Sequence, residues 1–469
     1  MKTSIYLAGD FVETLEKTEI INPFDKNLIS YCSNANESHI ETAIEKALQV
    51  QDELATIPIY ERYAILKYIG DSILSYKRRF TEIISLESGK PLRYAISEVE
   101  RAADTFFIAA EECKRLPKEY LSLDWTPSGK GKEGIVKHFP IGVIAAISPF
   151  NFPLNLVAHK LAPAIAAGCP VILKPSSKTP LTALMLAGII DQTKLLKGAL
   201  SVLPCNRNVG NLLVSHHAIA CLSFTGSPDV GWNMKSKSGK KKVILELGGN
   251  AGVYIHSDAD IELALKRCII GAFAYSGQVC IHAQRIFIHK NYYETFLSRF
   301  KTIVSQLQYG DPMDAETEIS VMIDEDNAKR VETWINESVA NGATIIIGGK
   351  RKGLYMEPTI LTNTRSGQKV LDEEVFGPVV CIEIVEDENE GIEKLNQTRF
   401  GLQGAIFTNN HQLIQKAFHN VKVGGLIVND VPTFRVDHMP YGGIKDSGIG
   451  REGVAYTIKE YMEPRILVY

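Results

Sequence analysis

The chain turns from a buried strand into a helix within the stretch Cys221-Leu222-Ser223-Phe224-Thr225-Gly226-Ser227-Pro228-Asp229-Val230-Gly231. Ser227 is a suitable helix N-cap, and Pro228 suits the first helical position. A strand that leads directly into a helix is the building unit of a parallel α/β sheet. The turn is also suited to phosphate, because Gly226 allows close backbone approach and helix N-termini attract anions. An ordinary strand-to-helix turn without a ligand has the same pattern.

Short apolar runs alternate with helical stretches on both sides of this turn, which predicts an α/β fold with a Rossmann-like, doubly wound parallel sheet. After Gly249 the alternation restarts less regularly, so we expect a second α/β domain with a boundary near Gly248-Gly249. Residues 38–115 have apolar residues at helical spacing. The predicted strands are Val143–Ile147, Pro170–Leu173, Ala199–Leu203, Ala220–Phe224 and Val243–Leu247, followed by Arg285–Ile288, Thr344–Ile347, Pro378–Ile384, Gly404–Phe407 and Leu426–Asn429.

The composition argues against several classes of protein. The 469 residues have a formal net charge of −3, which gives no reason to expect nucleic-acid or membrane partners. No apolar run is long enough to cross a bilayer, and Met1–Thr3 does not begin a signal peptide. The eight cysteines are scattered without a Cys-x-x-Cys pair, so we expect neither a disulfide framework nor a metal site. A reducing cytoplasm fits this pattern best.

One cysteine stands out from the other seven. Cys280 ends the stretch Ala274-Tyr275-Ser276-Gly277-Gln278-Val279-Cys280, and a helical pattern from Ile261 to Tyr275 precedes it. A thiol at the end of a helix, beside a glycine, is placed for access rather than for packing. We therefore predict that Cys280 is a nucleophile, which needs a base, an oxyanion donor and an electron acceptor.

Three other positions have residue types that such a nucleophile needs. Glu246 lies in an apolar strand, where its pKa rises and suits a general base, unless a lysine or backbone amides pair with it. Asn151, in Pro149-Phe150-Asn151-Phe152-Pro153, is either a rigid N–H donor for an oxyanion or the centre of an Asx turn. Lys174 ends an apolar run at the sheet edge where α/β proteins bind ligands, although a surface lysine before a proline turn looks the same.

Together these stretches resemble the aldehyde dehydrogenase superfamily over essentially the whole chain. The segments Asn155–His159 and Pro175–Lys178 look closest to the branch of lactaldehyde and non-phosphorylating glyceraldehyde-3-phosphate dehydrogenases. Seven pieces occur in the family's order, namely Ser148–Pro153, Leu173–Ser176, Phe224–Ser227, Leu245–Gly249, Gly277–Cys280, Glu374–Pro378 and Pro440–Gly453.

The resemblance implies a mechanism. Cys280 would attack an aldehyde as a thiolate, and the amide of Asn151 and the backbone N–H of Cys280 would hold the resulting oxyanion. Hydride transfer to a nicotinamide cofactor would convert the thiohemiacetal into a thioester. Glu246 would activate the water that hydrolyses this thioester to a carboxylic acid. Lys160 and Glu452 match positions that relay protons or position groups in some members.

The resemblance also implies NADP or NAD as the cofactor. Lys174 would bind the adenosine ribose, the turn at Gly226 the pyrophosphate, and Glu374 the nicotinamide ribose. Members that prefer NAD often have Glu at the position of Ser177, where a carboxylate repels a 2′-phosphate, so we predict that this chain accepts NADP. The expected cofactor-binding residues are Ser148, Pro149, Phe150, Lys174, Ser176, Ser177, Gly210, Phe224, Thr225, Gly226, Ser227, Leu247, Glu374 and Phe376.

Three side chains match positions that read the substrate in some relatives: Arg101, His159 and Arg435. Val279, beside the nucleophile, is apolar and provides no charge. We therefore expect a small hydroxylated or anionic aldehyde, such as lactaldehyde, glyceraldehyde 3-phosphate or a dicarboxylic semialdehyde. The alternative is that Arg101 and Arg435 form structural salt bridges.

The resemblance further implies three parts to the fold. Residues 1–118 and 141–247 would form the cofactor-binding domain, and 248–445 the catalytic domain. Residues 119–140 and 446–469 would form a small bridging sheet, through which the family dimerises. We therefore expect a homodimer or homotetramer.

Two rival functions remain at this point. A dehydrogenase that passes its thioester to coenzyme A commonly lacks the base that Glu246 provides. A non-catalytic structural relative would have lost the nucleophile or the base, and both are present in this chain.

Overall fold

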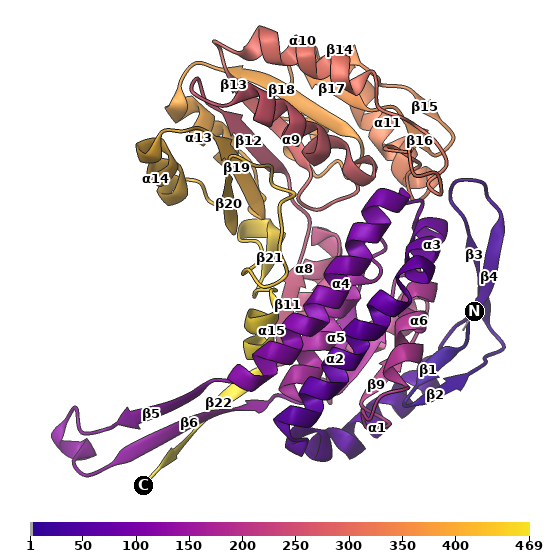
Figure 1. The fold of residues 1–469 in the computed structure, drawn as a ribbon, viewed down its shortest axis with the longest axis vertical. Helices are drawn as coiled ribbons and strands as arrows, with labels where there is room; N and C mark the ends of the chain where they lie inside the picture. The colour runs from indigo at the N-terminus through magenta and orange to yellow at the C-terminus, as the bar shows by residue number, and fades with distance from the viewer. Residues whose placement is uncertain (1–2) are drawn as a thin grey trace.

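The computed structural model describes residues 3–469 and contains two α/β units, each built around its own sheet (Figure 1). The first sheet has eight strands in the order β2-β1-β9-β8-β7-β10-β11-β21, and the second has seven in the order β14-β17-β18-β13-β12-β19-β20. β11 (Lys242–Glu246) is the last strand before the chain crosses over, and β12 (Ala251–Ile255) is the first strand of the second sheet. The chain crosses from one sheet to the other between Glu246 and Ala251, through Gly248-Gly249.

The five central strands of the first sheet run parallel, as the alternation of strands and helices predicted. The β1–β2 hairpin closes one edge of the sheet and β21 the other, and both pair antiparallel. The strands besides β11 are β1 (Ile5–Leu7), β2 (Asp10–Val12), β7 (Ile144–Ile147), β8 (Val171–Lys174), β9 (Leu200–Val202), β10 (Cys221–Thr225) and β21 (Gly448–Ile449).

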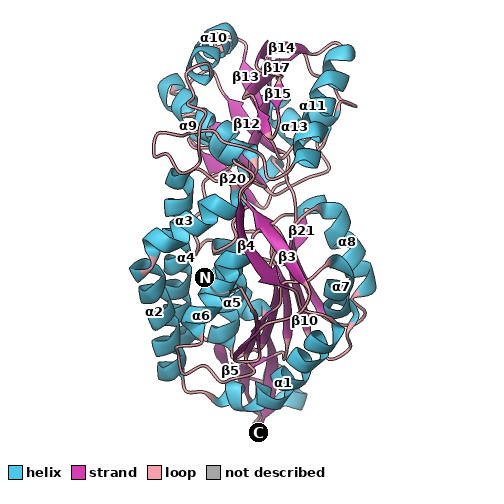
Figure 2. Ribbon diagram, turned by 90° about the vertical axis from the view of Figure 1, so that its right-hand side faces the viewer, coloured by secondary structure: helices cyan, strands magenta, loops and turns pink. Residues whose placement is uncertain are grey.

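Helices cover both faces of this sheet because successive residues of each buried strand point to opposite sides. Ile144 and Ala146 of β7 pack in one apolar cluster, and Ala145 and Ile147 pack in another. Figure 2 shows the two helical layers on either side of the strands. One layer contains α2 (Ile59–Ser75), α3 (Lys77–Ser88), α4 (Leu92–Glu112), α5 (Asn155–Ala167) and α6 (Pro180–Ile190), and the other contains α1 (Glu37–Thr56), α7 (Arg207–Ser215) and α8 (Pro228–Lys237).

The second sheet follows the same rule. Val253 and Ile255 face α9 and α10, whereas Tyr254 between them faces α13 and α14. β14 pairs antiparallel with β17, and the remaining strands are parallel. The elements are α9 (Ile261–Phe273), β13 (Ala283–His289), α10 (Tyr293–Val304), α11 (Glu325–Ala340), β14 (Thr344–Ile347), β17 (Thr359–Thr362), α12 (Lys369–Asp372), β18 (Val379–Val385), α13 (Glu388–Asn396), β19 (Gln403–Phe407), α14 (His411–Asn420) and β20 (Gly425–Val428).

A three-stranded antiparallel sheet projects from the first unit (Figure 1). β6 (Glu133–Pro140) lies between β5 (Lys118–Ser122) and β22 (Met462–Val468). The predicted bridging segment 446–469 is too wide, because its first part belongs to the first unit. β21 pairs with β11, and the apolar side chains of α15 (Val454–Glu460) are buried in the core of that unit. Two further hairpins stand apart, β3 (Lys17–Ile21) with β4 (Leu28–Ser33) and β15 (Arg351–Lys352) with β16 (Tyr355–Met356).

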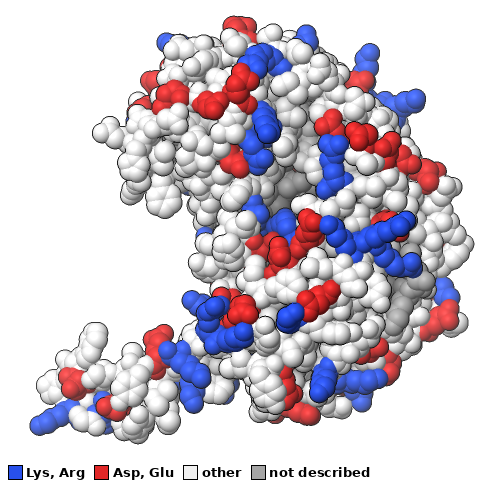
Figure 3. All heavy atoms as spheres, in the orientation of Figure 1, with Lys and Arg blue, Asp and Glu red and all other residues white. Residues whose placement is uncertain are grey.

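Charged side chains of both signs lie on the face shown in Figure 3. Figure 3 shows Lys and Arg interspersed with Asp and Glu over the face that it displays. Within residues 3–469, no helix is both long and apolar enough to cross a bilayer. The same residues contain no cluster of His, Cys, Asp and Glu side chains arranged to hold a metal ion.

Candidate active site

The loop that carries Cys280 begins with a strained turn. Tyr275, Ser276 and Gly277 have consecutive positive φ angles of 49°, 52° and 70°. Such a turn persists only when its surroundings fix it. The hydroxyl of Tyr275 donates to the carbonyl of Ser88 (3.0 Å), and that of Ser276 donates to the carbonyl of Ser320 (2.9 Å). These bonds anchor the loop to both units.

Cys280 is half-buried as a residue, whereas the other seven cysteines are buried. Its sulfur lies 3.1 Å from the hydroxyl of Tyr441. Burial raises the pKa of Cys280 to about 11, while the hydrogen bond from Tyr441 lowers it. The thiol form therefore predominates at neutral pH, and catalysis needs groups that stabilise the thiolate.

Glu246 and Asn151 lie on the same cavity as Cys280. Both carboxylate oxygens of Glu246 are buried without a hydrogen-bond partner, so the alternative of a paired structural glutamate does not hold. Burial, and then the nearby Glu452, raise the pKa of Glu246 well above its usual range. The side-chain nitrogen of Asn151 donates to the carbonyl of Gln278 (3.0 Å), which leaves its second N–H for an oxyanion.

This cavity, of about 370 Å³, is lined by residues of both units. Its floor includes the N-terminus of α8, where Ser227 is the N-cap but its side chain caps no backbone N–H, so first-turn donors remain for phosphate. The hydroxyls of Ser148 and Thr225 are buried without a hydrogen-bond partner, and a polar ligand would provide one. The expected cofactor residues that line the cavity are Pro149, Phe150, Thr225, Gly226, Ser227, Leu247, Glu374 and Phe376.

Glu374 enters the cavity from the second unit. Its carboxylate accepts a hydrogen bond from the backbone N–H of Gly249 (3.0 Å). Burial raises the pKa of Glu374 to about 7. A Cβ atom on Gly248 would collide with this carboxylate, so the contact requires glycine. Phe376 has a positive φ angle of 47°. Its ring meets that of Phe150 edge-on, with 5.9 Å between the ring centroids.

The remaining expected cofactor residues lie outside this cavity. The stem of Lys174 crosses Gly210, where a Cβ atom would approach the lysine Cδ to 2.6 Å. Ser177 and Lys178 line a second cavity of about 320 Å³, whose wall also includes Lys26. The hydroxyl of Ser176 accepts from the N–H of Lys178 (3.2 Å). Phe224 is buried, and its ring packs on Gly226.

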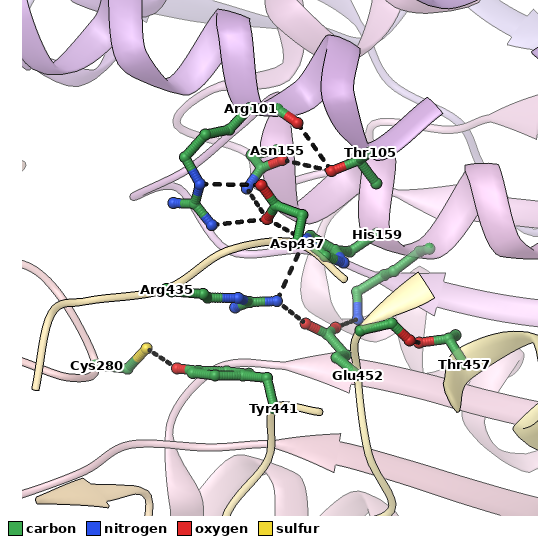
Figure 4. Close-up of polar contacts among 12 residues, drawn as sticks. Arg101, Thr105, Asn155, His159, Cys280, Arg435, Asp437, Tyr441, Glu452 and Thr457 are labelled. Carbon is green, nitrogen blue, oxygen red and sulfur yellow. Dashed lines mark hydrogen bonds and ion pairs between the residues drawn. The ribbon is translucent and has the colours of Figure 1, made fainter. Parts of the chain in front are cut away.

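The three expected substrate residues share one buried polar cluster (Figure 4). Arg101 forms a two-point ion pair with Asp437 (2.7 and 3.2 Å), and His159 bonds the same carboxylate (2.7 Å). Arg435 pairs with Glu452 (3.1 Å) and contacts His159 (3.3 Å). Arg101 and Arg435 therefore form the salt bridges that the alternative prediction described.

Lys160 completes this cluster. Its ammonium group lies 3.4 Å from Glu452 and 3.0 Å from the hydroxyl of Ser223. Burial opposes ionisation of Glu452, but Lys160 and Arg435 outweigh it and lower its pKa. Burial, and then Arg435, lower the pKa of His159. Three cations, Arg101, Lys160 and Arg435, thus pair with the two carboxylates of Asp437 and Glu452.

Sequence reasoning missed two members of this site. Asp437 joins Arg101, His159 and Asn155, and it lay unnoticed in the loop quoted for Arg435. Tyr441 lay inside a recognised family motif but received no role. The two glycines that follow Tyr441, Gly442 and Gly443, indicated a tight turn at this position. The sequence did not indicate that Tyr441 faces Cys280.

Known proteins resemble this chain in sequence and in fold. A model of the aldehyde dehydrogenase family matches residues 11–467. The chain belongs to the aldehyde dehydrogenase family. Its membership confirms the predicted enzyme class, an oxidoreductase that acts on an aldehyde group. It also confirms the α/β fold.

Three relatives place the chain within this family. It is 43% identical to a 3-sulfolactaldehyde dehydrogenase of Priestia aryabhattai, over 99% of this chain and 97% of that protein. The crystal structure of aldehyde dehydrogenase 21 from Physcomitrella patens, in complex with the reaction product succinate, matches with a TM-score of 0.98 and 40% identity, over 99% and 98% of the two chains. A glyceraldehyde-3-phosphate dehydrogenase from Methanocaldococcus jannaschii, complexed with NADP, matches with a TM-score of 0.93 and 34% identity, over 97% and 100%. These relatives agree with the predicted branch.

The strained turn before Cys280 makes a prediction about stability. A Cβ atom on Gly277 would collide with the carbonyl of Gly377, in addition to the cost of φ near 70°. We expect Gly277→Ala to lower the free energy of unfolding by about 2–4 kcal/mol and to reduce activity strongly. Chemical denaturation and steady-state rates measure both effects.

Gly131 provides the matched control. Its φ is 73°, and nothing lies within 4 Å of a Cβ atom there. Gly131→Ala should therefore cost only about 1 kcal/mol, the penalty of the left-handed backbone alone. Equal losses from both substitutions would contradict the packing argument.

Proposed function

We propose that this protein oxidises a small anionic or hydroxylated aldehyde to its carboxylic acid, with NADP or NAD as hydride acceptor. The observation that carries the proposal is the single cavity that brings together the thiol of Cys280, the amide of Asn151 and the unpartnered carboxyl of Glu246. A nucleophile, an oxyanion donor and a base on one cavity are the three groups that aldehyde oxidation through a thioester requires.

Each group has a distinct task. The sulfur of Cys280 bonds to the aldehyde carbon, and the free N–H of Asn151 holds the oxygen of the thiohemiacetal. A bound nicotinamide ring supplies the acceptor for the hydride that leaves this carbon. Glu246 then takes a proton from the water that adds to the thioester, and the C–S bond breaks to release the acid. The net change consumes aldehyde, water and oxidised cofactor and yields acid, reduced cofactor and a proton.

Glu246 also separates this function from its main rival. Because its oxygens have no partner and its pKa is raised, it is poised to accept a proton from water. A coenzyme A-acylating enzyme needs water excluded from the thioester instead. The intact Cys280 and Glu246 likewise argue against a non-catalytic relative.

The first test separates acylation from hydrolysis. We expect the wild-type protein to reduce NADP or NAD with an aldehyde and to release free acid, with or without coenzyme A. Glu246→Gln should lower the turnover by about 10²–10⁴-fold yet keep a burst of one cofactor reduced per site, because only hydrolysis needs the base. Stopped-flow absorbance and product analysis measure both.

Cys280→Ala is the control, and it should abolish the burst while leaving the fold intact. An acyl-coenzyme A product, or loss of the burst in Glu246→Gln, would count against the proposal.

NADP acceptance rests on the surroundings of Ser177. Ser177 is exposed and presents no carboxylate, while Lys178 and Lys26 lie on the same cavity. Asp324 and Glu325 line that cavity too, and Lys178 is 3.6 Å from Asp324. The Methanocaldococcus jannaschii relative was crystallised with NADP.

We therefore expect Ser177→Glu to lower kcat/KM for NADP by at least about 10-fold, because the new carboxylate faces the 2′-phosphate. The rate with NAD should fall much less. Ser177→Gln, which has the same shape without the charge, should keep NADP activity. A wild-type kcat/KM much higher for NAD than for NADP would overturn the prediction.

The substrate class rests on Arg435, a buried cation that acts on the thiol of Cys280. The guanidinium Nε of Arg435 is buried without a partner, so this residue retains a donor for a ligand. Two of the similar proteins are described with a sulfonated aldehyde or a dicarboxylate product. An aldehyde that carries a sulfonate, carboxylate or phosphate fits this electrostatic field better than a neutral one.

The test compares charged and neutral aldehydes of similar size. Arg435→Gln should lower kcat/KM for 3-sulfolactaldehyde or succinate semialdehyde by about 10–100-fold more than for lactaldehyde, the usual effect of losing a hydrogen bond to a charged group. Arg435→Lys, which keeps the charge, should lose less. The ratio between substrates is the readout, because Arg435 also supports Glu452. Equal losses for charged and neutral aldehydes would assign Arg435 to structure alone.

A further inference from the structure

Tyr441 occupies a fixed position against the nucleophile. Its hydroxyl lies 3.1 Å from the sulfur of Cys280, and its ring is buried. Two backbone hydrogen bonds, from the N–H of Tyr441 to Glu452 (3.0 Å) and back (2.7 Å), hold the residue in place. The guanidinium of Arg435 lies 3.7 Å above the ring (Figure 4). The backbone hydrogen bonds and the guanidinium together fix the position of the hydroxyl.

Glu246, the proposed base, does not form a hydrogen bond to the sulfur of Cys280. Both oxygens of Glu246 lack a hydrogen-bond partner, so Glu246 does not bond the thiol. Among the side chains of residues 3–469, only the hydroxyl of Tyr441 lies within hydrogen-bonding distance of this sulfur. A charged sulfur in a buried site needs such a donor, because water no longer solvates it.

We propose that Tyr441 is a catalytic residue whose hydroxyl donates a hydrogen bond to the sulfur of Cys280 whenever that sulfur carries negative charge. The inference rests on the proposed function and extends it. The donor acts twice in the cycle, once on the attacking thiolate and once on the thiolate that leaves the thioester.

The second of these steps balances without a further reactant. Water adds to the thioester carbon, and Glu246 takes its proton. The C–S bond then breaks, and its electron pair returns to the sulfur. The phenol keeps its proton and shares it with the sulfur as a hydrogen bond, so Tyr441 stabilises the leaving group without being consumed.

The charges around the sulfur define how much such a donor matters. Arg435 favours the thiolate, whereas Glu246 and Glu374 oppose it. Burial, and then the sulfur of Cys280, raise the pKa of Tyr441 well above its usual range, so the phenol remains protonated and able to donate. The cation of Arg435 over the ring strengthens this donor further. The hydrogen bond from Tyr441 and the charge of Arg435 therefore both act against the two carboxyl groups.

Alkylation of Cys280 by iodoacetamide tests the inference without any aldehyde. The rate follows the thiolate fraction, so its pH dependence reports the apparent pKa of the thiol. We expect Tyr441→Phe to raise that pKa by about one to two pH units, the loss of one hydrogen bond to a charged group. Turnover should fall by about 10–100-fold, and KM for the aldehyde should change less than about 3-fold. Mass spectrometry confirms that the label is on Cys280.

Tyr254→Phe is the matched control. Tyr254 lies in β12, buried in another cluster, and its hydroxyl has no partner, so its loss should leave the alkylation profile unchanged. Should Tyr441→Phe fold poorly, Tyr441→3-fluorotyrosine tests the same hydrogen bond by strengthening it instead of removing it. Its more acidic phenol should lower the pKa of the thiol.

An alkylation profile that is identical in wild-type protein and Tyr441→Phe would overturn the inference, as would an unchanged profile with 3-fluorotyrosine. These results are independent of the proposed function, which fails instead if the wild-type protein oxidises no aldehyde. A purely structural role for Tyr441 would lower the thermal stability without moving the profile.

Discussion

The backbone carbonyl of Cys280 approaches Gly249 so closely that a Cβ atom at Gly249 would collide with it. This contact occurs where the chain crosses from the first sheet to the second. The preceding residue, Gly248, packs in the same way against the carboxylate of Glu374. Glu246 lies two residues before this pair, at the end of β11. Two glycines therefore let Glu246, Cys280 and Glu374 meet at one point, although they come from distant parts of the chain.

The buried charges around this point depend on one another. Glu452 is shared by Lys160 and Arg435, and Asp437 is shared by Arg101 and His159. Burying such groups is costly unless each is paired, so removing one would leave another uncompensated. The arrangement keeps Glu452 ionised beside Glu246, and their repulsion helps to raise the pKa of Glu246. The cluster thus connects the residues that stabilise the fold to those that perform the chemistry.

Several features followed from the sequence because their causes are local. Ser227 and Pro228 start α8 as expected, since capping depends on a few neighbouring residues. The alternation of apolar runs predicted the parallel strands around Phe224. Two strands of the second sheet escaped notice, β12 and β17. β12 contains Gly252, which weakens a strand pattern.

The sequence by itself determined the fold class and the family, and it predicted Cys280, Glu246 and Asn151 as a reacting set, because all of these depend on residue types in a fixed order along one chain. Only the tertiary structure decided that Tyr441 faces the sulfur, that Arg101 and Arg435 are already ion-paired, and that Gly448–Ile449 joins the first sheet. Each of these is a contact between residues far apart in sequence. Such contacts depend on how two sheets pack, and no local pattern encodes the distance between them.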